Sequence, residues 1–157
     1  MGGHEDRLLE LLEEEETLQL ESFTNETALA IGLRLVETAR NEGAAVTIDI
    51  MRGEQQLFHY ALPGTSVDND EWIRRKNRVV RRFGHSSFYM GTYYRNAGTT
   101  IDEKHLLDGR RFTPHGGAFP VIVKGVGMVG TVTVSGLPQE EDHKLVVRVL
   151  REFCEPS

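Results

Sequence analysis

The chain has 157 residues, of which 39% are hydrophobic and 27% are charged, and its formal net charge at pH 7 is −6. This balance predicts a single folded domain rather than a disordered chain, and the acidic total disfavours non-specific binding to nucleic acid. The only cysteine, Cys154, excludes an internal disulfide framework and a cysteine-rich zinc site.

Helix and strand patterns alternate in the first third of the chain. Residues 8–16 carry a short leucine-rich helix pattern with an acidic end, and its apolar face requires a partner, either the domain or another subunit. A longer helix pattern spans residues 25–43 and stops at a glycine. Residues 46–50 and 56–60 alternate as strands do, and a turn at 52–53 joins them into a hairpin.

The middle of the chain is predicted to be helical. Asp68 and Glu71 stand three residues apart, as in a capping box, and open a helix that ends near Gly84. Residues 86–93 predict a further short helix that two serines introduce. The pattern over residues 96–109 is weak and favours a mixture of helix and loop.

The last third of the chain predicts a second hairpin and a helix. Residues 119–123 and 128–135 are the strands, and Pro138 is expected as the first residue of the final helix. Residues 125–130 match the G-x-G-x-x-G pattern of dinucleotide-binding loops. Because such a loop must lead into a helix, and a strand follows here, we interpret the segment as a hairpin turn.

Two hairpins and several amphipathic helices predict an antiparallel sheet layered with helices, which is an α+β architecture. Polar side chains recur on one predicted face of that sheet, at Thr47, Asp49, Thr131, Thr133 and Ser135. Such a face lines a pocket, meets a neighbouring chain or is solvated, and the sequence leaves these alternatives open.

Basic residues crowd the helix that follows Asp68, at Arg74, Arg75, Lys76, Arg78, Arg81 and Arg82. Arginine pairs well with phosphate and carboxylate groups, so one interpretation is an anion site. The alternative is a solvated face, or a contact with acidic residues such as 13–16 of another subunit.

Glycines flank His85 and His115, and glycine allows the backbone to approach a ligand closely. A neutral imidazole can bind iron, although neither position has zinc-site spacing and the chain has no C-x-x-C-H motif. The alternative is that each histidine ties loop backbone together. Asp142 and His143 begin the final helix. Either Asp142 interacts with the helix N-terminus and His143 hydrogen-bonds to a loop, or the two form an acid–base pair. A G-x-S-x-G motif is absent, so the sequence predicts no covalent-catalysis triad.

Several segments taken together resemble one known family. They are residues 66–76 on the tryptophan-bearing helix, 115–120 around the histidine–diglycine loop, 134–137 and 141–143. Over residues 23–153 the chain resembles the UPF0303 family, a branch of the GlcG-like superfamily that carries the haem-degrading-domain label. The resemblance implies a profilin-like fold, with an antiparallel sheet of about five strands flanked by helices. It also implies homo-oligomers, often large rings, and haem or tetrapyrrole binding by some members.

We therefore expect an N-terminal helical segment over residues 1–22 and a single domain over residues 23–157. No apolar run approaches the roughly 20 residues of a membrane span, and the first residues lack a basic and apolar signal segment. The expected location is the cytoplasm. The expected partners are other copies of the chain and a small molecule, with neither nucleic acid nor membrane.

The candidate ligand-binding residues combine the positions that match the family motifs with nearby basic residues and histidines. They are Asn69, Trp72, Arg75, Lys76, His85, His115, Gly116, Gly117, Ser135 and His143. For this set to form one site, the tryptophan-bearing helix and the histidine–diglycine loop must meet beside the sheet. Apolar walls would come from Trp72, Tyr93 and Tyr94.

Haem is the leading ligand among the hypotheses that this resemblance supports. His115 or His85 would coordinate the iron. The propionates would pair with Arg75, Lys76 or Arg78.

Two alternatives come from other classes of function. One is a non-enzymatic assembly protein, in which the leucine-rich segment and the charge runs build symmetric interfaces. The other is an enzyme that acts on a small carboxylate or phosphate with Lys76 and His143. The sequence does not decide whether any reaction is catalysed.

Overall fold

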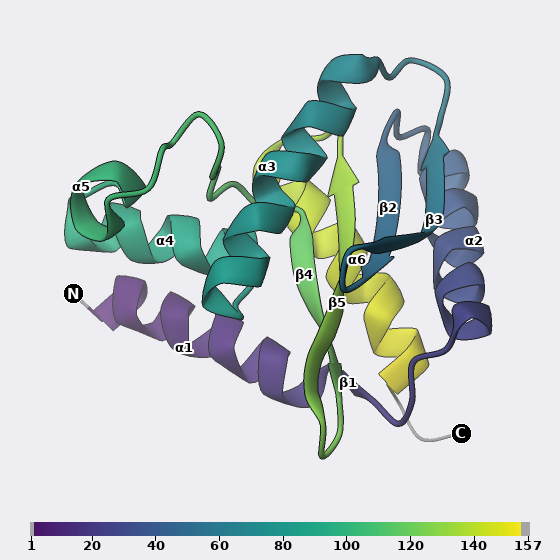
Figure 1. Cartoon of the computed structure of the whole chain (residues 1–157), viewed down its shortest axis with the longest axis horizontal. Coiled ribbons are helices and arrows are strands. Elements are labelled where there is room, and N and C mark those ends of the chain that lie inside the picture. The colour runs from purple at the N-terminus through teal and green to yellow at the C-terminus, as the bar shows by residue number, and fades with distance from the viewer. Residues whose placement is uncertain (1, 155–157) are drawn as a thin grey trace.

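The computed structural model describes residues 2–154, with side chains from residue 5 onward (Figure 1). In chain order the elements are α1 (Gly2–Thr17), β1 (Gln19–Leu20), α2 (Asn25–Glu42), β2 (Thr47–Arg52), β3 (Gln55–Ala61), α3 (Val67–Phe83), α4 (Ser87–Ala97), α5 (Ile101–His105), β4 (Ala118–Val123), β5 (Gly127–Ser135) and α6 (Gln139–Cys154). The five strands form one sheet flanked by helices, which confirms the predicted α+β class. No helix within the described residues is long and apolar enough to cross a membrane.

The strand order across the sheet is β1-β4-β5-β2-β3. The two predicted hairpins, β2–β3 and β4–β5, are present and pair with each other through β2 and β5 in antiparallel register. The sheet departs from the expected pattern at one edge, where the two-residue strand β1 runs parallel to β4. So short a segment has no period that a sequence pattern could reveal.

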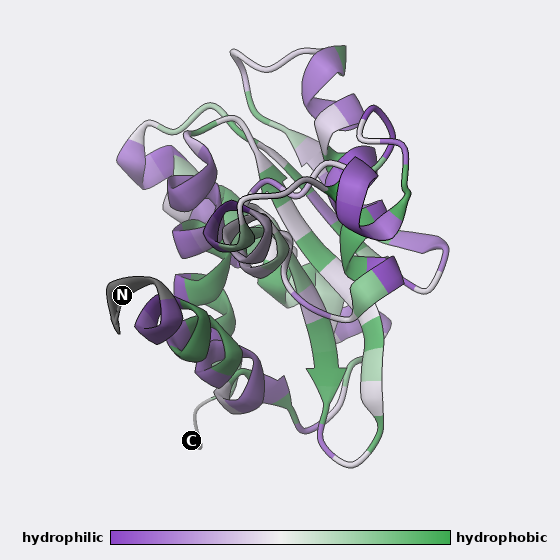
Figure 2. Ribbon diagram, turned by 90° about the vertical axis from the view of Figure 1, so that its left-hand side faces the viewer, coloured by the Kyte–Doolittle hydropathy of each residue, from purple (hydrophilic) through white to green (hydrophobic). Residues whose placement is uncertain are grey.

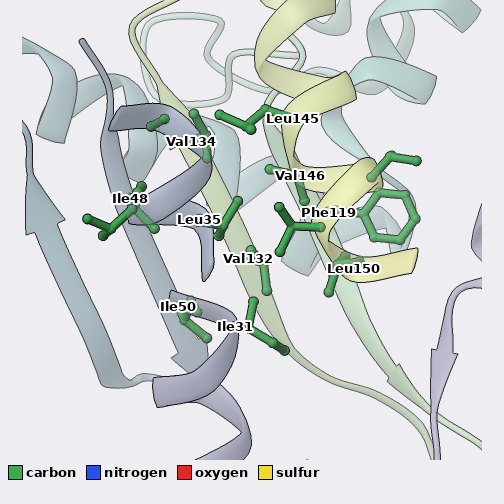
Figure 3. Close-up of a cluster of buried hydrophobic side chains, with 14 of the residues drawn as sticks. Ile31, Leu35, Ile48, Ile50, Phe119, Val132, Val134, Leu145, Val146 and Leu150 are labelled. Carbon is green, nitrogen blue, oxygen red and sulfur yellow. The ribbon is translucent and has the colours of Figure 1, made fainter. Parts of the chain in front are cut away.

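The apolar face of the sheet carries the main core, which α2 and α6 cover (Figure 3). Ile48 and Ile50 of β2 alternate with polar neighbours, and Val132 and Val134 of β5 do the same, so all four point to this face. Figure 2 shows the result, with hydrophobic residues concentrated in the strands and hydrophilic residues spread over the helices.

The opposite face of the sheet is the polar one, and α3 covers it (Figure 1). Its polar side chains are almost completely inaccessible to solvent, at Thr47, Asp49, Thr131, Thr133 and Ser135. The predicted polar face therefore exists, but it is not solvated. Buried polar groups require partners, and Asn77 of α3 provides them for Asp49 and Thr133. The hydroxyls of Thr47 and Thr131 have no hydrogen-bond partner within the described residues.

The start of α3 differs from the predicted capping box. The N-cap is Ser66, whose hydroxyl accepts from the backbone of Asp68, and the partner side chain is Asn69 rather than Glu71. The amide oxygen of Asn69 accepts from the Ser66 N–H at 2.9 Å. Serine followed by asparagine makes the same reciprocal bonds as a usual capping box, which is why Asp68 and Glu71 are not needed. The helix ends at Gly84, as predicted.

Three boundaries also differ from the predicted ones. Helix α4 continues to Ala97, the weak pattern contains the five-residue helix α5, and α6 begins one residue after Pro138. The carbonyl of Pro138 accepts from the N–H groups of Glu141 and Asp142, so the proline caps the helix from just outside it.

The apolar face of α1 packs against its own domain. Leu11 is fully buried, and α1 runs beside α4 (Figure 1). Two of the four consecutive glutamates at its end contact histidines of the same chain, Glu14 at His143 and Glu15 at His85. Of the two partners that the sequence left open for this helix, the structure therefore gives the domain.

Candidate functional site

Trp72 of α3 and His115 of the loop before β4 stack on each other, with ring centroids 5.5 Å apart and an angle of 17° between planes. The tryptophan-bearing helix and the histidine–diglycine loop therefore meet beside the sheet, as the family motifs led us to expect. Trp72 also carries the guanidinium of Arg75 over its ring, 5.6 Å from the centroid.

The two glycines after His115 allow this loop to press onto its surroundings. A side chain at Gly117 would come within 2.4 Å of the Val134 carbonyl and 2.6 Å of the Lys76 amine, and its φ of +134° is one that other residues rarely adopt. A side chain at Gly116 would meet the Gln139 carbonyl at 2.3 Å. The diglycine thus positions His115 and contributes no side chain to the site.

Beneath the stacked rings lies a buried ion pair between Lys76 of α3 and Asp142 of α6, with 3.2 Å between Nζ and Oδ2. Lys76 also donates to the Val134 carbonyl at 3.0 Å, and Asp142 accepts from the N–H groups of Gly136 and Leu137. Burial lowers the pKa of Lys76 and raises that of Asp142, while the attraction between the two groups opposes both shifts.

A cavity beside the stacked rings and the ion pair is named here the tryptophan pocket. Its volume is about 260 Å³, and five of the predicted ligand residues line it: Asn69, Trp72, Lys76, His115 and Ser135. Asn69 and Trp72 follow each other on one face of α3, and the Asn69 amide lies 3.4 Å from the hydroxyl of Ser135. The amine of Lys76, although nearly inaccessible, reaches the floor of this pocket.

A wider cavity of about 630 Å³, which we name the arginine groove, continues from the tryptophan pocket. The two cavities share Trp72, His115 and Gln139. The groove also takes in Arg75, Arg95 and Arg110, together with the rings of Tyr94 and Phe112. Arg75 and Tyr94 were predicted from the sequence. Arg95 and Arg110 were not, because they lie at or beyond the ends of segments with a clear helix or strand pattern.

His115 is electrostatically suited to remain neutral. Stacking removes part of its ring from water, and the charges of Lys76 and Arg95 add to this, so the pKa of His115 lies below its usual value of 6.5. His115 as a whole is nevertheless exposed. A neutral and accessible imidazole is able to bind a metal ion or accept a hydrogen bond.

Two predicted residues are not brought to this site. His85 lies beyond the end of α3, where its Nδ1 is 2.7 Å from Glu15, and it lines neither cavity. His143 is buried against Phe88 and Phe119, with its Nε2 2.8 Å from Glu14. Both histidines contact glutamates of α1, whereas the alternative expected for His85 was a contact with loop backbone.

The sequence and the fold are those of a known family of proteins. A family model described as "Haem degrading protein HbpS-like" matches residues 23–151, and the chain belongs to this family. A UPF0303 protein of Streptomyces coelicolor is 56% identical over 144 residues, which cover 92% of this chain and 91% of the relative. A UPF0303 protein of Psychromonas ingrahamii is 42% identical over 151 residues, covering 96% and 95%.

Among solved structures, the Ybr137w protein superposes with a TM-score of 0.87 at 35% identity, covering 94% of this chain and 87% of the other. A structure of a PduOC–haem complex gives a TM-score of 0.64 at 18% identity, covering 83% and 92%. At that identity the likeness concerns the fold, with its five-stranded sheet and flanking helices.

Proposed function

We propose that this protein is an oligomeric small-ligand-binding protein and that its ligand is haem or a related tetrapyrrole, held in the arginine groove. The observation that carries the proposal is the stacked pair of His115 and Trp72, which stands where the groove meets the tryptophan pocket. Family membership and the haem complex of a protein with the same fold support it.

The residues of the groove fit such a ligand. Its volume of about 630 Å³ is in the range of cofactor sites. His115, with its lowered pKa, offers a neutral nitrogen to iron. Arg75, Arg95 and Arg110 offer guanidinium groups to propionates, and the rings of Trp72 and Tyr94 provide apolar walls to a flat macrocycle. Haem would supply iron chemistry, while the chain would bind it and orient it.

A haem titration of the purified protein tests this proposal. The parent chain should shift the Soret band on binding, and His115→Ala should lose that shift. His85→Ala is the matched control, because His85 is the other candidate ligand but lies outside the groove. An unchanged spectrum with the parent protein, or loss of the shift in His85→Ala alone, contradicts the proposal.

Assembly through another face is the second candidate function, and one feature of α2 favours it. Leu29 and Leu33 stand one turn apart and are 43% and 55% exposed, which leaves an apolar strip on the outside of the described domain. We propose that this strip joins copies of the chain. Leu29→Lys together with Leu33→Lys should reduce the assembled mass in light scattering, whereas unchanged mass contradicts the role of α2.

A further inference from the structure

A further pocket, separate from the two cavities named above and of about 360 Å³, lies between α3 and the β2–β3 hairpin. The residues of α3 that line it include Asp70, Arg74, Asn77 and Arg81, which follow each other on one face of the helix. Trp72 and Lys76 project from the other side of the same helix. The pocket is therefore separate from the tryptophan pocket, and α3 forms a wall of both.

A β-bulge shapes the floor of this pocket between α3 and the hairpin. The register between β2 and β3 shifts between Ile50 and Met51, so that Leu57 is the extra residue. In a regular strand Gln56 and His59 would point to opposite faces, because they are three residues apart. Because of the bulge, both side chains lie on the same face of the sheet as Asp49, and both contact it. Bulges that redirect side chains in this way are frequent beside functional sites.

The carboxylate of Asp49 is buried and accepts three hydrogen bonds from the chain. It accepts from Gln56 Nε2 at 2.7 Å, from His59 Nδ1 at 3.1 Å and from Asn77 Nδ2 at 3.4 Å. The short bond that Asn77 makes with Thr133 of β5 extends this network into the polar face of the sheet. Asp49 therefore holds the pocket floor together through three bonds within the chain.

Asp70 is the acceptor that remains available. Its buried Oδ1 lies 3.0 Å from His59 Nε2, but the pair lacks hydrogen-bond geometry. No donor within residues 2–154 satisfies this oxygen. A buried carboxylate oxygen without a donor is costly, and a hydroxyl or amino group of a ligand would satisfy it.

Guanidinium groups follow Asp70 along the same face of α3. Arg74 is paired with Glu71, whereas Arg81 makes no ion pair or hydrogen bond in the described part of the chain. Arg78 donates to the carbonyl of Arg111. Burial lowers the pKa of Arg78, and so do the like charges of Arg111, Arg74 and Arg81. The C-terminal half of this wall thus carries two guanidinium groups, those of Arg78 and Arg81, that form no ion pair with a carboxylate within the described residues.

We propose that this pocket binds a small organic anion that also carries a hydroxyl or amino group. The carboxylate or phosphate of the ligand pairs with Arg78 and Arg81, and its hydroxyl or amino group donates to Asp70. An anion without a donor leaves Asp70 unsatisfied, and a neutral alcohol leaves the arginines unpaired. The site therefore selects ligands that combine both groups, and it acts independently of the arginine groove.

Isothermal titration with matched pairs of probes tests the proposal on the full chain. L-malate and succinate differ by one hydroxyl group, and glycerol 3-phosphate and propyl phosphate share a three-carbon chain and differ by the hydroxyl groups alone. We expect malate or glycerol 3-phosphate to bind about tenfold or more tightly than its partner lacking the hydroxyl. The pair that binds distinguishes a carboxylate ligand from a phosphate ligand. Binding of none of the four probes at about 10 mM overturns the proposal.

Three variants assign any binding to this pocket. Arg81→Gln, an exposed position without partners, should fold normally and weaken binding about tenfold, while Arg82→Gln, its neighbour outside the pocket, should not. Asp70→Ala should bring each probe pair to similar affinities. Equal loss in Arg81→Gln and Arg82→Gln, or an intact hydroxyl preference in Asp70→Ala, overturns the proposal. Haem titration of Arg81→Gln should match the parent protein, so failure here is distinct from failure of haem binding.

Discussion

Lys76 and Asp142 form an ion pair whose side chains are only 4% and 2% exposed, although 66 positions separate them in the chain. The pair joins α3 to the start of α6, and both of its residues line the tryptophan pocket together with the stacked rings of Trp72 and His115. Its charges are compensated by backbone groups of Val134, Gly136 and Leu137 as well as by each other. It therefore links the stability of the domain to the shape of the tryptophan pocket.

Removing one member of this pair should be costly. Lys76→Met leaves the Asp142 carboxylate buried without its counter-ion, and we expect the free energy of unfolding to fall by about 3–5 kcal/mol. Urea denaturation measures the change. The double variant Lys76→Met with Asp142→Asn removes the isolated charge as well and should recover part of the loss. A single-variant cost under about 1 kcal/mol would show that water reaches the pair and screens it.

The diglycine should tolerate no side chain at its second position. Gly117→Ala introduces a methyl group at 2.4 Å from the Val134 carbonyl and strains a φ of +134°. We expect about 2–3 kcal/mol of lost stability and a weaker stack of His115 on Trp72. Gly125→Ala is the matched control, because its φ is also positive but no described atom lies within 4 Å of the added carbon. Thermal unfolding should rank Gly117→Ala clearly below Gly125→Ala, and equal effects would contradict the close packing of the loop.

The two glycine-flanked histidines should titrate on opposite sides of 6.5. The hydrogen bond that His85 donates to Glu15 raises the pKa of His85, and desolvation with nearby positive charge lowers that of His115. Proton NMR of the imidazole signals measures both values. Glu15→Gln should lower the pKa of His85 and leave that of His115 in place. The reverse order of the two pKa values would refute the environments described for them.

The raised pKa of His85 also makes stability depend on pH. The folded state holds this proton more tightly than the unfolded state, so the contribution is complete below the unfolded value of about 6.5. It is lost as pH rises through the folded pKa. Unfolding curves at acidic and alkaline pH should therefore differ more for the parent than for His85→Gln. Identical pH dependence in both proteins would argue against the contact with Glu15.

Helix α1 should stabilise its own subunit. Leu11 is fully buried, so Leu11→Ala is expected to cost about 2–5 kcal/mol through lost burial and the cavity left behind. Leu9 lies on the same helix but is 60% exposed, and Leu9→Ala should change stability by less than about 0.5 kcal/mol. Chemical denaturation compares the two variants. Equal effects would mean that α1 does not pack as described.

Local patterns were sufficient for much of the fold. The two hairpins, the long helices and the polar face of the sheet follow from the periods of apolar residues and from glycine stops, which act over a few neighbouring positions. The same holds for part of the site, because Trp72 and Lys76 stand one turn apart on α3 and must share a face. Ser135 follows Thr133 by two residues along β5, so the two side chains must point to the same face of the sheet.

Contacts between distant segments were decided only by the tertiary structure. No periodic pattern of apolar residues in the sequence indicates three of these contacts. They are the parallel pairing of β1, the bulge at Leu57 and the ion pair of Lys76 with Asp142. The contacts of His85 and His143, two of the candidate ligand residues, with Glu15 and Glu14 of α1 also join segments far apart in the chain. Chemistry within one helix or strand is fixed by spacing, whereas the partner of a side chain across the molecule depends on how the layers pack.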